Sequence, residues 1–339
     1  MGMISSRIPA FVLTGFLGAG KTTLLNRLLK DPALADTAVV INEYGEAGLD
    51  HLLVEKSGDG VVLLSSGCLC CSLRGDLLDT LADLAARRAS GDLPPFARVV
   101  IETTGLAYPT PVLQTLMAPQ LAGAGYVLAG VIAVADALRG EALLDQHAEA
   151  IAQLAVADRI LVSKTDLAGD SAAFMARLRA LNPRAAIGPM PDAGAAALLE
   201  EPDFPSAGAA VGARPFFSAH DAAIASFTLE TDKVLTPGRF VTFIDELRER
   251  FGEGLLRFKA LVRLADEPGR PVVLHGVQHW FAPPERLDAW PGPDRRTRIV
   301  VIGRDLDRRA IEDLFAAFCD EPRLDAPDRA ALTDNPLAF

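Results

Sequence analysis

The chain has 339 residues, of which 50% are hydrophobic and 23% charged, and its formal net charge at pH 7 is −11. A chain of this length is longer than a domain with one hydrophobic core usually is, which indicates two globular domains. The net negative charge and the lack of a Lys/Arg run argue against a nucleic-acid partner. No apolar run has the length of a membrane-spanning helix, so no membrane partner is expected.

Strand-like apolar runs alternate with helical patterns over the first part of the chain. The expected strands are 10–13, 38–41, 61–64, 99–101, 127–134 and 160–162. Apolar residues at helical spacing predict helices at 22–30, 73–89, 141–157 and 171–181. This alternation is typical of an α/β fold with a mainly parallel sheet and helices on its faces.

The composition changes at about Gly188 to Pro, Gly, Ala and acidic residues, which predicts a linker. Beyond it, strands are expected at 226–229, 255–264, 271–280 and 297–302, and helices at 238–251 and 306–318. This order fits a smaller α+β domain with helices on one face of an antiparallel sheet. The predicted organisation is a first domain at 1–187, a linker at 188–214, a second domain at 215–325 and a loosely ordered tail at 326–339.

A glycine-rich loop at 15–22, here called the phosphate loop, follows a strand and opens a helix. Its glycines allow backbone N–H groups to surround phosphate oxygens at a helix N-terminus. We expect Lys21 to contact the β- and γ-phosphates and the Thr22 hydroxyl to coordinate Mg²⁺. The predicted nucleotide-binding residues of this loop are Gly15, Gly18, Ala19, Gly20, Lys21, Thr22 and Thr23.

A second phosphate-site motif ends the expected strand 99–101, where Glu102 is followed by Thr-Thr-Gly105. The Glu102 carboxylate is expected to hold a Mg²⁺-bound water or to influence the attacking water, and the Gly105 N–H to sense the γ-phosphate. The structural alternative is a carboxylate that only caps the following turn. Lys21, Thr22 and Glu102 are the predicted catalytic residues.

A base-recognition motif follows the strand 160–162 and has the sequence Ser163-Lys164-Thr165-Asp166. The Asp166 carboxylate can accept hydrogen bonds from the guanine N1–H and exocyclic amine, while the Lys164 stem covers the ring. Adenine would leave that carboxylate unmatched, at a cost of about 1–3 kcal/mol. The motif therefore favours GTP over ATP, and the alternative is a loop Asp that caps the chain at Leu167.

The acidic segment 42–50 lies between the phosphate loop and the cysteines and contains three acids and two glycines. We expect it to contact both Mg²⁺ and a second metal, with Asp50 contributing to Mg²⁺ and Glu43 to the second metal. A solvated acidic loop is the alternative.

Three of the four cysteines, Cys68, Cys70 and Cys71, fall within four consecutive positions after Gly67. They are too few and too crowded for a secreted disulfide framework, which favours a reducing cytoplasm. Two or three thiolates with Glu43 or a histidine would form a near-tetrahedral Zn²⁺ or Co²⁺ site. The alternatives are buried free cysteines and a redox pair, although a vicinal disulfide is strained.

The remaining candidate ligands are expected to have structural roles. Cys319 lies among Phe315 and Phe318 and is expected to pack within a helix. His275 and His279 are expected on one face of a strand, about 13 Å apart, so that they do not share a metal.

Together these motifs resemble the CobW family of metallochaperone GTPases. The matching segments are 15–22, 42–50, 67–71, 102–105 and 163–166, with further likeness at 153–158, 237–240 and 274–280. The resemblance implies a GTPase domain, an α+β C-terminal domain, nucleotide-dependent binding of a transition metal at the cysteines, and delivery to a client metalloprotein. Two features depart from the family pattern: Ser163 replaces an Asn, and the linker lacks the histidine-rich run of some members.

The interpretation is a cytoplasmic, Mg²⁺-dependent GTPase of slow turnover that binds GTP and GDP, loads one metal ion and transfers it to a client. Zinc is the expected metal because the Irving–Williams order favours it over Co²⁺. The alternatives are a nucleotide-gated zinc or redox sensor, a cobalt chaperone for cobalamin or nitrile hydratase maturation, and a P-loop kinase with a structural zinc. A homodimer is left open.

Overall fold

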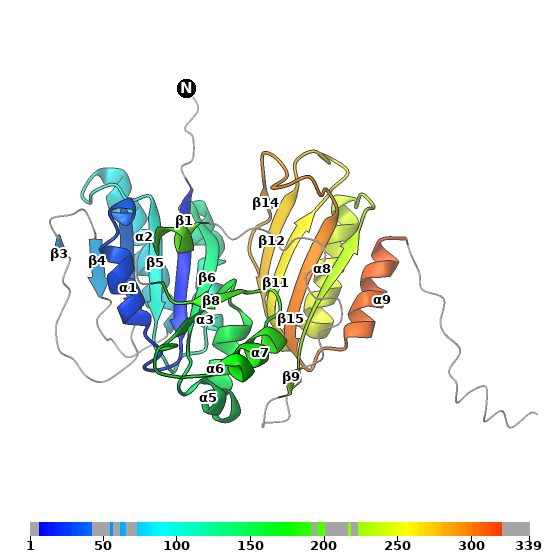
Figure 1. Ribbon diagram of the computed structural model, residues 1–339. Coiled ribbons are helices and arrows are strands. Elements are labelled where there is room, and N and C mark those ends of the chain that lie inside the picture. Colours follow the sequence, from blue (N-terminus) through cyan, green and yellow to red (C-terminus); the bar gives the residue numbers. More distant parts are fainter. Residues whose placement is uncertain are drawn as a thin grey trace, which may run out of the picture.

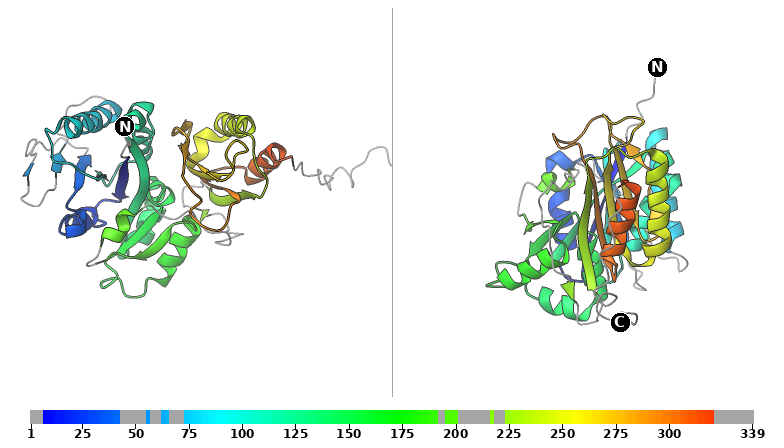
Figure 2. Two further views of the ribbon diagram at one scale, coloured as in Figure 1. Left: turned by 90° about the horizontal axis from the view of Figure 1, so that it is seen from above. Right: turned by 90° about the vertical axis from the view of Figure 1, so that its right-hand side faces the viewer.

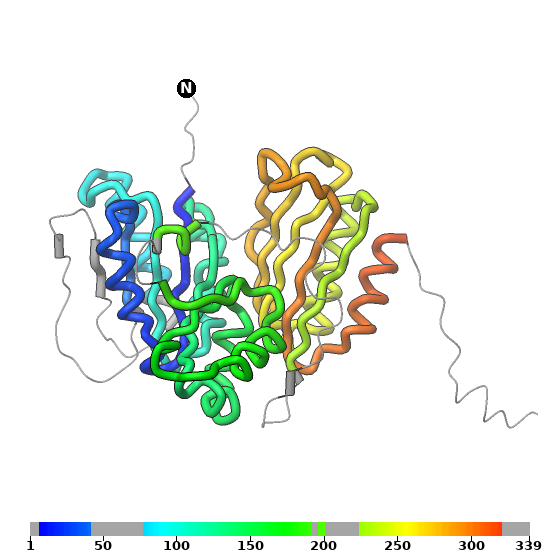
Figure 3. Tube along the Cα trace, in the orientation of Figure 1, coloured from blue at the N-terminus to red at the C-terminus, as the bar shows by residue number. Residues whose placement is uncertain are grey.

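The computed structural model describes residues 7–42, 55–56, 62–65, 73–191, 195–200, 216–217 and 223–320. Figure 3 traces the path of the chain. Two β-sheets stand side by side, each with helices of its own (Figure 1). The first sheet is built from the N-terminal part of the sequence and the second from the C-terminal part.

The first sheet has the strand order β3-β4-β2-β5-β1-β6-β7-β8 among the described residues. Its strands are β1 Ile8–Gly15, β2 Thr37–Asn42, β3 Glu55–Lys56, β4 Val62–Ser65, β5 Arg98–Thr103, β6 Tyr126–Asp136, β7 Arg159–Ser163 and β8 Ala186–Pro189. Its helices are α1 Lys21–Leu29, α2 Leu73–Ser90, α3 Thr110–Leu116, α4 Pro119–Gly123, α5 Gly140–Gln146, α6 Ala148–Ala155 and α7 Ala172–Leu181, with 3₁₀ turns at Pro32–Leu34 and Ala195–Leu199. All of its strand pairs are parallel except β3 with β4.

Both faces of this sheet are covered, which explains the continuous apolar runs of its strands. In β1, Ala10 and Val12 belong to one buried cluster and Phe11 and Leu13 to another on the opposite face. A strand that is buried on both faces needs apolar residues at every position rather than at alternate ones. Because the strands are parallel, β1, β5 and β7 end at one edge of the sheet, the lower edge in Figure 1.

The second sheet is antiparallel and has the order β13-β12-β11-β15-β10-β9, with β14 beside β12. Its strands are β9 Phe216–Phe217, β10 Ala223–Thr231, β11 Leu255–Val262, β12 Val272–Val277, β13 Trp280–Phe281, β14 Glu285–Arg286 and β15 Thr297–Arg304. Helices α8 Pro237–Phe251 and α9 Arg308–Phe318 cover one face, as the right-hand view of Figure 2 shows, and a 3₁₀ turn spans Gly252–Gly254.

The other face of the second sheet packs against the first domain. Ile224, Leu256, Val277, Val300 and Ile302 belong to the same buried cluster as the core on one face of the first sheet. The left-hand view of Figure 2 shows the second sheet between its own helices and the first domain. The hydrophobic core is therefore continuous from one domain to the other.

Polar contacts accompany this apolar interface. Asp158, just after α6, lies 3.5 Å from Arg257 Nη2 and 3.6 Å from Lys259 Nζ of β11, and accepts a hydrogen bond from the Val131 N–H. Burial alone would raise the pKa of Asp158, but Lys259, Arg257 and the Val131 N–H outweigh it and hold the pKa below its usual value. Burial, with the same two cations, lowers the pKa of His275 well below its ordinary value, so the imidazole is neutral at pH 7.

Most of the expected elements are present, and the differences have local causes. The expected helix 141–157 is two helices, α5 and α6, because His147 has extended backbone (φ −130°, ψ 111°). The expected strand 271–280 is likewise divided, since Gln278 has a positive φ of 53° in a turn between β12 and β13. His275 and His279 are therefore not on one face of a strand, contrary to our prediction.

Helices α3 and α4 and strands β3, β8, β9 and β14 were not expected. Both helices have a proline in the first turn, which a helix tolerates because the N–H groups of that turn have no intrahelical partner. Within the described ranges, no helix is both long and apolar enough to cross a bilayer. The predicted tail 326–339 lies outside the described residues.

Asn182 fixes the end of α6 to the end of α7 and is fully buried. Its Nδ2 donates to the carbonyls of Leu154, Ala155 and Ala157 at 2.8–3.1 Å. Its Oδ1 accepts from the N–H groups of Arg184 and Ala185. Asn182 therefore satisfies backbone carbonyls at the end of α6 and backbone N–H groups that follow α7.

We expect Asn182→Ala to lower the free energy of unfolding by about 2–4 kcal/mol, because buried carbonyls lose their donor. Urea unfolding monitored by circular dichroism measures the change. Thr242→Ala is the control, since it removes one exposed hydrogen bond to Gly238 and should change stability by less than about 0.5 kcal/mol. Equal unfolding midpoints for both variants would contradict the role given to Asn182.

Candidate nucleotide-binding site

The phosphate loop connects β1 to α1 and has backbone conformations that require glycine. Gly15 has a φ of 139°, and a Cβ there would lie 2.4 Å from the carbonyl oxygen of its sheet partner Val134. Gly18 and Gly20 have φ values of 75° and 105°. Gly20 is the N-cap of α1 and contributes no side chain, so the first turn of that helix faces the loop with its backbone N–H groups.

Lys21 is the first residue of α1, and its side chain folds back over the loop. Its Nζ donates to the carbonyls of Gly15 (2.9 Å) and Phe16 (3.3 Å), and the residue is 8% exposed. A positive charge is thereby held inside the curve of the loop, next to the N-terminus of a helix. Both features favour an anion at this position.

Thr22 and Glu102, which are 80 positions apart in the sequence, meet at the edge of the sheet. The Thr22 hydroxyl donates to Glu102 Oε1 at 2.9 Å. Glu102 is 6% exposed near the end of β5, and Thr22 is exposed at the surface of α1. Two oxygen ligands of the kind that Mg²⁺ prefers therefore lie together beside the phosphate loop.

The chain after Glu102 packs tightly against the phosphate loop. A Cβ at Gly105 would lie 2.5 Å from both Cα and N of Leu17, so only glycine fits there without displacing the loop. Deeper in the sheet, the Thr103 hydroxyl donates to the Thr14 hydroxyl at 2.9 Å and joins β5 to β1. Position 105 is therefore in backbone contact with the loop that the sequence predicts to hold phosphates.

The motif 163–166 lies on the other side of the phosphate loop. The buried Ser163 hydroxyl donates to the Ala19 carbonyl at 2.6 Å. Lys164 Nζ donates to the Gly18 carbonyl at 2.9 Å and to Asp136 Oδ2 at 2.6 Å. Asp166 is exposed, and Thr23, the last predicted loop residue, is exposed on α1.

Three residues that were not predicted as site residues also contribute to this region, one of them in the family-like segment 153–158. Asp136, at the end of β6, is 3% exposed and pairs with Lys164. His147, between α5 and α6, contacts the ring of Phe16 at a centroid distance of 4.5 Å. Gln153 donates from α6 to the Gly105 and Ala107 carbonyls. Asp136 had a signal in the sequence, since it follows an apolar run at the carboxyl end of a parallel strand.

The predicted metal ligands Cys68, Cys70, Cys71, Glu43 and Asp50 lie outside the described residues. Across the described ranges, no group of three or more His, Cys, Asp or Glu side chains is arranged to hold a metal ion. Cys319 is buried in the core of the second domain, as expected.

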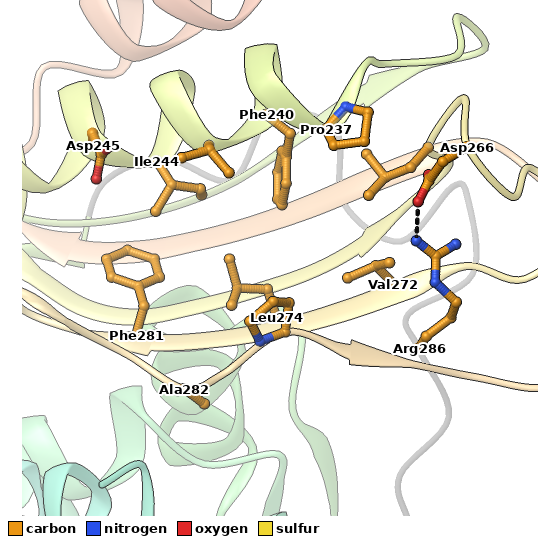
Figure 4. A pocket seen from close by; sticks show the side chains of 13 residues that line it. Pro237, Phe240, Ile244, Asp245, Asp266, Val272, Leu274, Phe281, Ala282 and Arg286 are labelled. Atoms are coloured by element: carbon orange, nitrogen blue, oxygen red, sulfur yellow. Dashed lines mark hydrogen bonds and ion pairs between the residues drawn. The ribbon is translucent and has the colours of Figure 1, made fainter. Parts of the chain in front are cut away.

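A separate cavity of about 390 Å³ lies in the second domain, between α8 and the strands β12 and β13. Figure 4 shows Phe240 and Ile244 of α8 above Leu274 and Phe281 of the sheet. Its one drawn ion pair joins Arg286 to Asp266 at 2.6 Å. This lining is apolar and its charges are paired, so the phosphate loop remains the candidate site for chemistry.

Two family models match the chain. The nucleotide-binding domain described as CobW/HypB/UreG matches residues 9–189, and the cobalamin synthesis protein cobW C-terminal domain matches residues 224–319. The first match ends with β8 and the second begins in β10. Together they cover both sheets.

Relatives similar over nearly their whole length carry names that refer to zinc. The zinc chaperone YjiA of Escherichia coli is 33% identical over 316 residues, which cover 92% of this chain and 98% of the relative. The zinc chaperone CobW of a Sinorhizobium species is 30% identical, with 92% and 97% covered.

Two zinc-bound crystal structures of the E. coli YjiA GTPase have similar folds. One is of the GTPase itself, with a TM-score of 0.66 at 29% identity, covering 92% of this chain and 99% of the other. The second is of a triple mutant in which a glutamate and two cysteines are replaced by alanine, with a TM-score of 0.68 and the same identity and coverage.

We expect Gly105→Ala to raise the dissociation constant for guanine nucleotide at least about tenfold, because the added Cβ would displace Leu17 and the phosphate loop. Titration with a fluorescent GTP analogue measures it. Gly123→Ala is the control, since a Cβ there meets no atom within 4 Å. Unchanged nucleotide affinity in Gly105→Ala would show that the segment 102–105 does not contribute to nucleotide binding.

Proposed function

The chain belongs to the CobW family of P-loop GTPases, and we propose that it is a GTP-dependent zinc metallochaperone. It binds GTP at the phosphate loop, binds one zinc ion through Cys68, Cys70, Cys71 and Glu43, and transfers that zinc to a client protein. The observation that carries the nucleotide part is the contact of Thr22 with Glu102 beside a loop that holds the Lys21 ammonium.

The donor set suits Mg²⁺. Thr22 Oγ1 and Glu102 Oε1 are hard oxygen ligands 2.9 Å apart at the edge of the phosphate loop. These two residues, with Asp50, would hold the ion directly or through a water, and the bound ion would supply positive charge to the β- and γ-phosphates.

Hydrolysis depends on charge and position. The Lys21 ammonium binds the phosphate oxygens, and the backbone N–H groups at the start of α1 stabilise the charge that develops on them. Gly105, in backbone contact with the loop, fixes the side of the site next to Glu102. No arginine is assigned to the transition state, so turnover is slow.

Selectivity for guanine rests on the motif 163–166. Lys164 is held by Asp136 and by the Gly18 carbonyl, which directs its aliphatic stem along the edge of the nucleotide site. Asp166 follows on an exposed turn, where its carboxylate can accept hydrogen bonds from a base.

The zinc part is supported by the relatives and by chain topology. Relatives named zinc chaperones span nearly the whole chain. β4 runs parallel to β2, which runs parallel to β5, and Ile41 of β2 pairs with both Ser65 and Glu102, so β4 ends at the same edge of the sheet as β5. Cys68 is three residues beyond Ser65, a separation of at most about 11 Å in extended chain.

Asp166→Ala should lower GTP affinity at least about tenfold and bring the affinities for GTP and ATP close to each other, because the guanine edge loses its acceptor. Competition titrations measure both affinities. Asp170→Ala is the matched control, as this exposed neighbour accepts a hydrogen bond from the Ala172 N–H and follows the base-recognition motif. A wild-type protein that binds ATP as tightly as GTP would contradict the assignment.

Replacing Cys70 with Ser should abolish the sulfur-to-metal charge-transfer band of bound Co²⁺ at low metal concentration, while metal-free GTP binding stays nearly unchanged. Wild-type affinity for the metal should be higher with a GTP analogue than with GDP. Cys319→Ser is the control, because this thiol is buried in the second domain. The measurement uses a low metal concentration, because YjiA crystallised with zinc even after a glutamate and two cysteines were replaced by alanine.

Three outcomes separate the alternatives. Equal metal affinity in the apo, GDP and GTP forms would indicate a structural zinc site that does not respond to the nucleotide. Nucleotide-dependent affinity without transfer of labelled zinc to any client would favour a sensor. Preferential loading of Co²⁺ when both ions are present would favour a cobalt chaperone.

A further inference from the structure

Gln153 is a fully buried polar residue on α6, at the start of the family-like segment 153–158, and no role at the nucleotide site was predicted for it. Its Nε2 donates to the Gly105 carbonyl at 3.2 Å and to the Ala107 carbonyl at 2.9 Å. Both acceptors are backbone groups about fifty positions earlier in the chain. The side chain therefore joins a helix to the segment that follows Glu102.

That segment is a tight turn against the phosphate loop. The Ala107 N–H donates to the Thr104 carbonyl at 3.4 Å, which closes the turn 104–107. On its outer side, Gly105 is in backbone contact with Leu17 of the phosphate loop. On its inner side, the two carbonyls face Gln153. The turn is thus held between the loop and α6.

A primary amide matches this arrangement. Its nitrogen carries two hydrogens, and here each has a carbonyl to bind. A carboxylate of the same shape would place acceptors against acceptors, and an apolar side chain of the same length would leave two carbonyls without a donor.

A small cavity adjoins the same side chain. It has a volume of about 20 Å³ and is lined by Gln153 together with Phe16 of the phosphate loop and Asp136. Gln153 Oε1 is buried and has no hydrogen-bond partner among the described residues. The cavity has room for one water, which would give this oxygen a donor.

We propose that Gln153 is a positioning residue for GTP hydrolysis. It does not touch the nucleotide; it fixes the turn 104–107 so that the Gly105 N–H is held at the γ-phosphate side of the phosphate loop. This role rests on the GTPase activity of the proposed function, and it names the residue that orders one side of that site.

The expected effect is on turnover rather than on binding. Nucleotide affinity comes from the phosphate loop, Lys21 and Asp166, none of which Gln153 contacts through its amide. The turn matters when the γ-phosphate reacts, because a displacement of a fraction of an ångström there removes a hydrogen bond to developing charge. Loss of Gln153 should therefore lower kcat and leave KM nearly unchanged.

The test measures steady-state GTP hydrolysis by Gln153→Glu and Gln153→Met with saturating Mg²⁺. We expect kcat to fall at least about tenfold in both variants and KM to change less than about threefold. In Gln153→Glu, protonation restores one O–H donor, so the kcat ratio of variant to wild type should rise as the pH is lowered from about 8 to 6. Gln153→Met keeps the test valid should the buried carboxylate prevent folding.

Asn182→Ala is the matched control. Its amide binds the backbone carbonyls of Leu154, Ala155 and Ala157, which directly follow Gln153 at the C-terminal end of α6, and these bonds do not involve the turn 104–107. It should lower stability while the folded protein keeps wild-type kcat.

Two results would overturn the proposal: folded Gln153 variants with kcat within about twofold of wild type, or an equal loss of kcat in Asn182→Ala. A wild-type protein that does not hydrolyse GTP would instead contradict the proposed function itself.

Discussion

The close approach of two backbone segments is the constraint on which the nucleotide site depends. Gly105 lies against Leu17, and Gly15 lies against Val134, at distances that leave no room for a side chain. This contact brings Glu102 to Thr22 and places the turn 104–107 next to the phosphate loop. Ser163 and Lys164 hold the same loop from the other side through the Ala19 and Gly18 carbonyls. The loop is therefore fixed by neighbours on both flanks.

The residues of this site that the sequence could predict are those with short-range signals. The phosphate loop, Glu102 and the motif 163–166 each follow an apolar strand, and parallel strands place their carboxyl ends at one edge. Asp136 and His147 were not predicted as site residues, and Gln153 was noted only within the family-like segment 153–158, because the contacts of all three join segments far apart in sequence. Ser163 is a related case: the sequence places it in the base-recognition motif, whereas its hydroxyl donates to the Ala19 carbonyl of the phosphate loop.

The helices and strands that the sequence could predict are likewise those with short-range signals. Long apolar strands such as β1, β6 and β11 and amphipathic helices such as α1 and α8 were predicted to within a few residues, since burial on one or both faces sets their patterns. The break at His147 and the turn at Gln278 were not, because each depends on a single backbone conformation that composition does not reveal. The interface between the domains was also beyond prediction. Nothing in the local sequence pairs Asp158 with Arg257, or Gln114 with Gln278 at 3.0 Å.

The continuous core has a thermodynamic consequence. The second sheet has α8 and α9 on one face and the first domain on the other. Without the first domain, one of its apolar faces would be exposed to water. Separation would expose Leu256, Val300 and Ile302 and leave Asp158 and Arg257 without each other. The two parts should therefore melt in one cooperative transition. A C-terminal fragment that begins at β10 would present an apolar sheet surface prone to self-association.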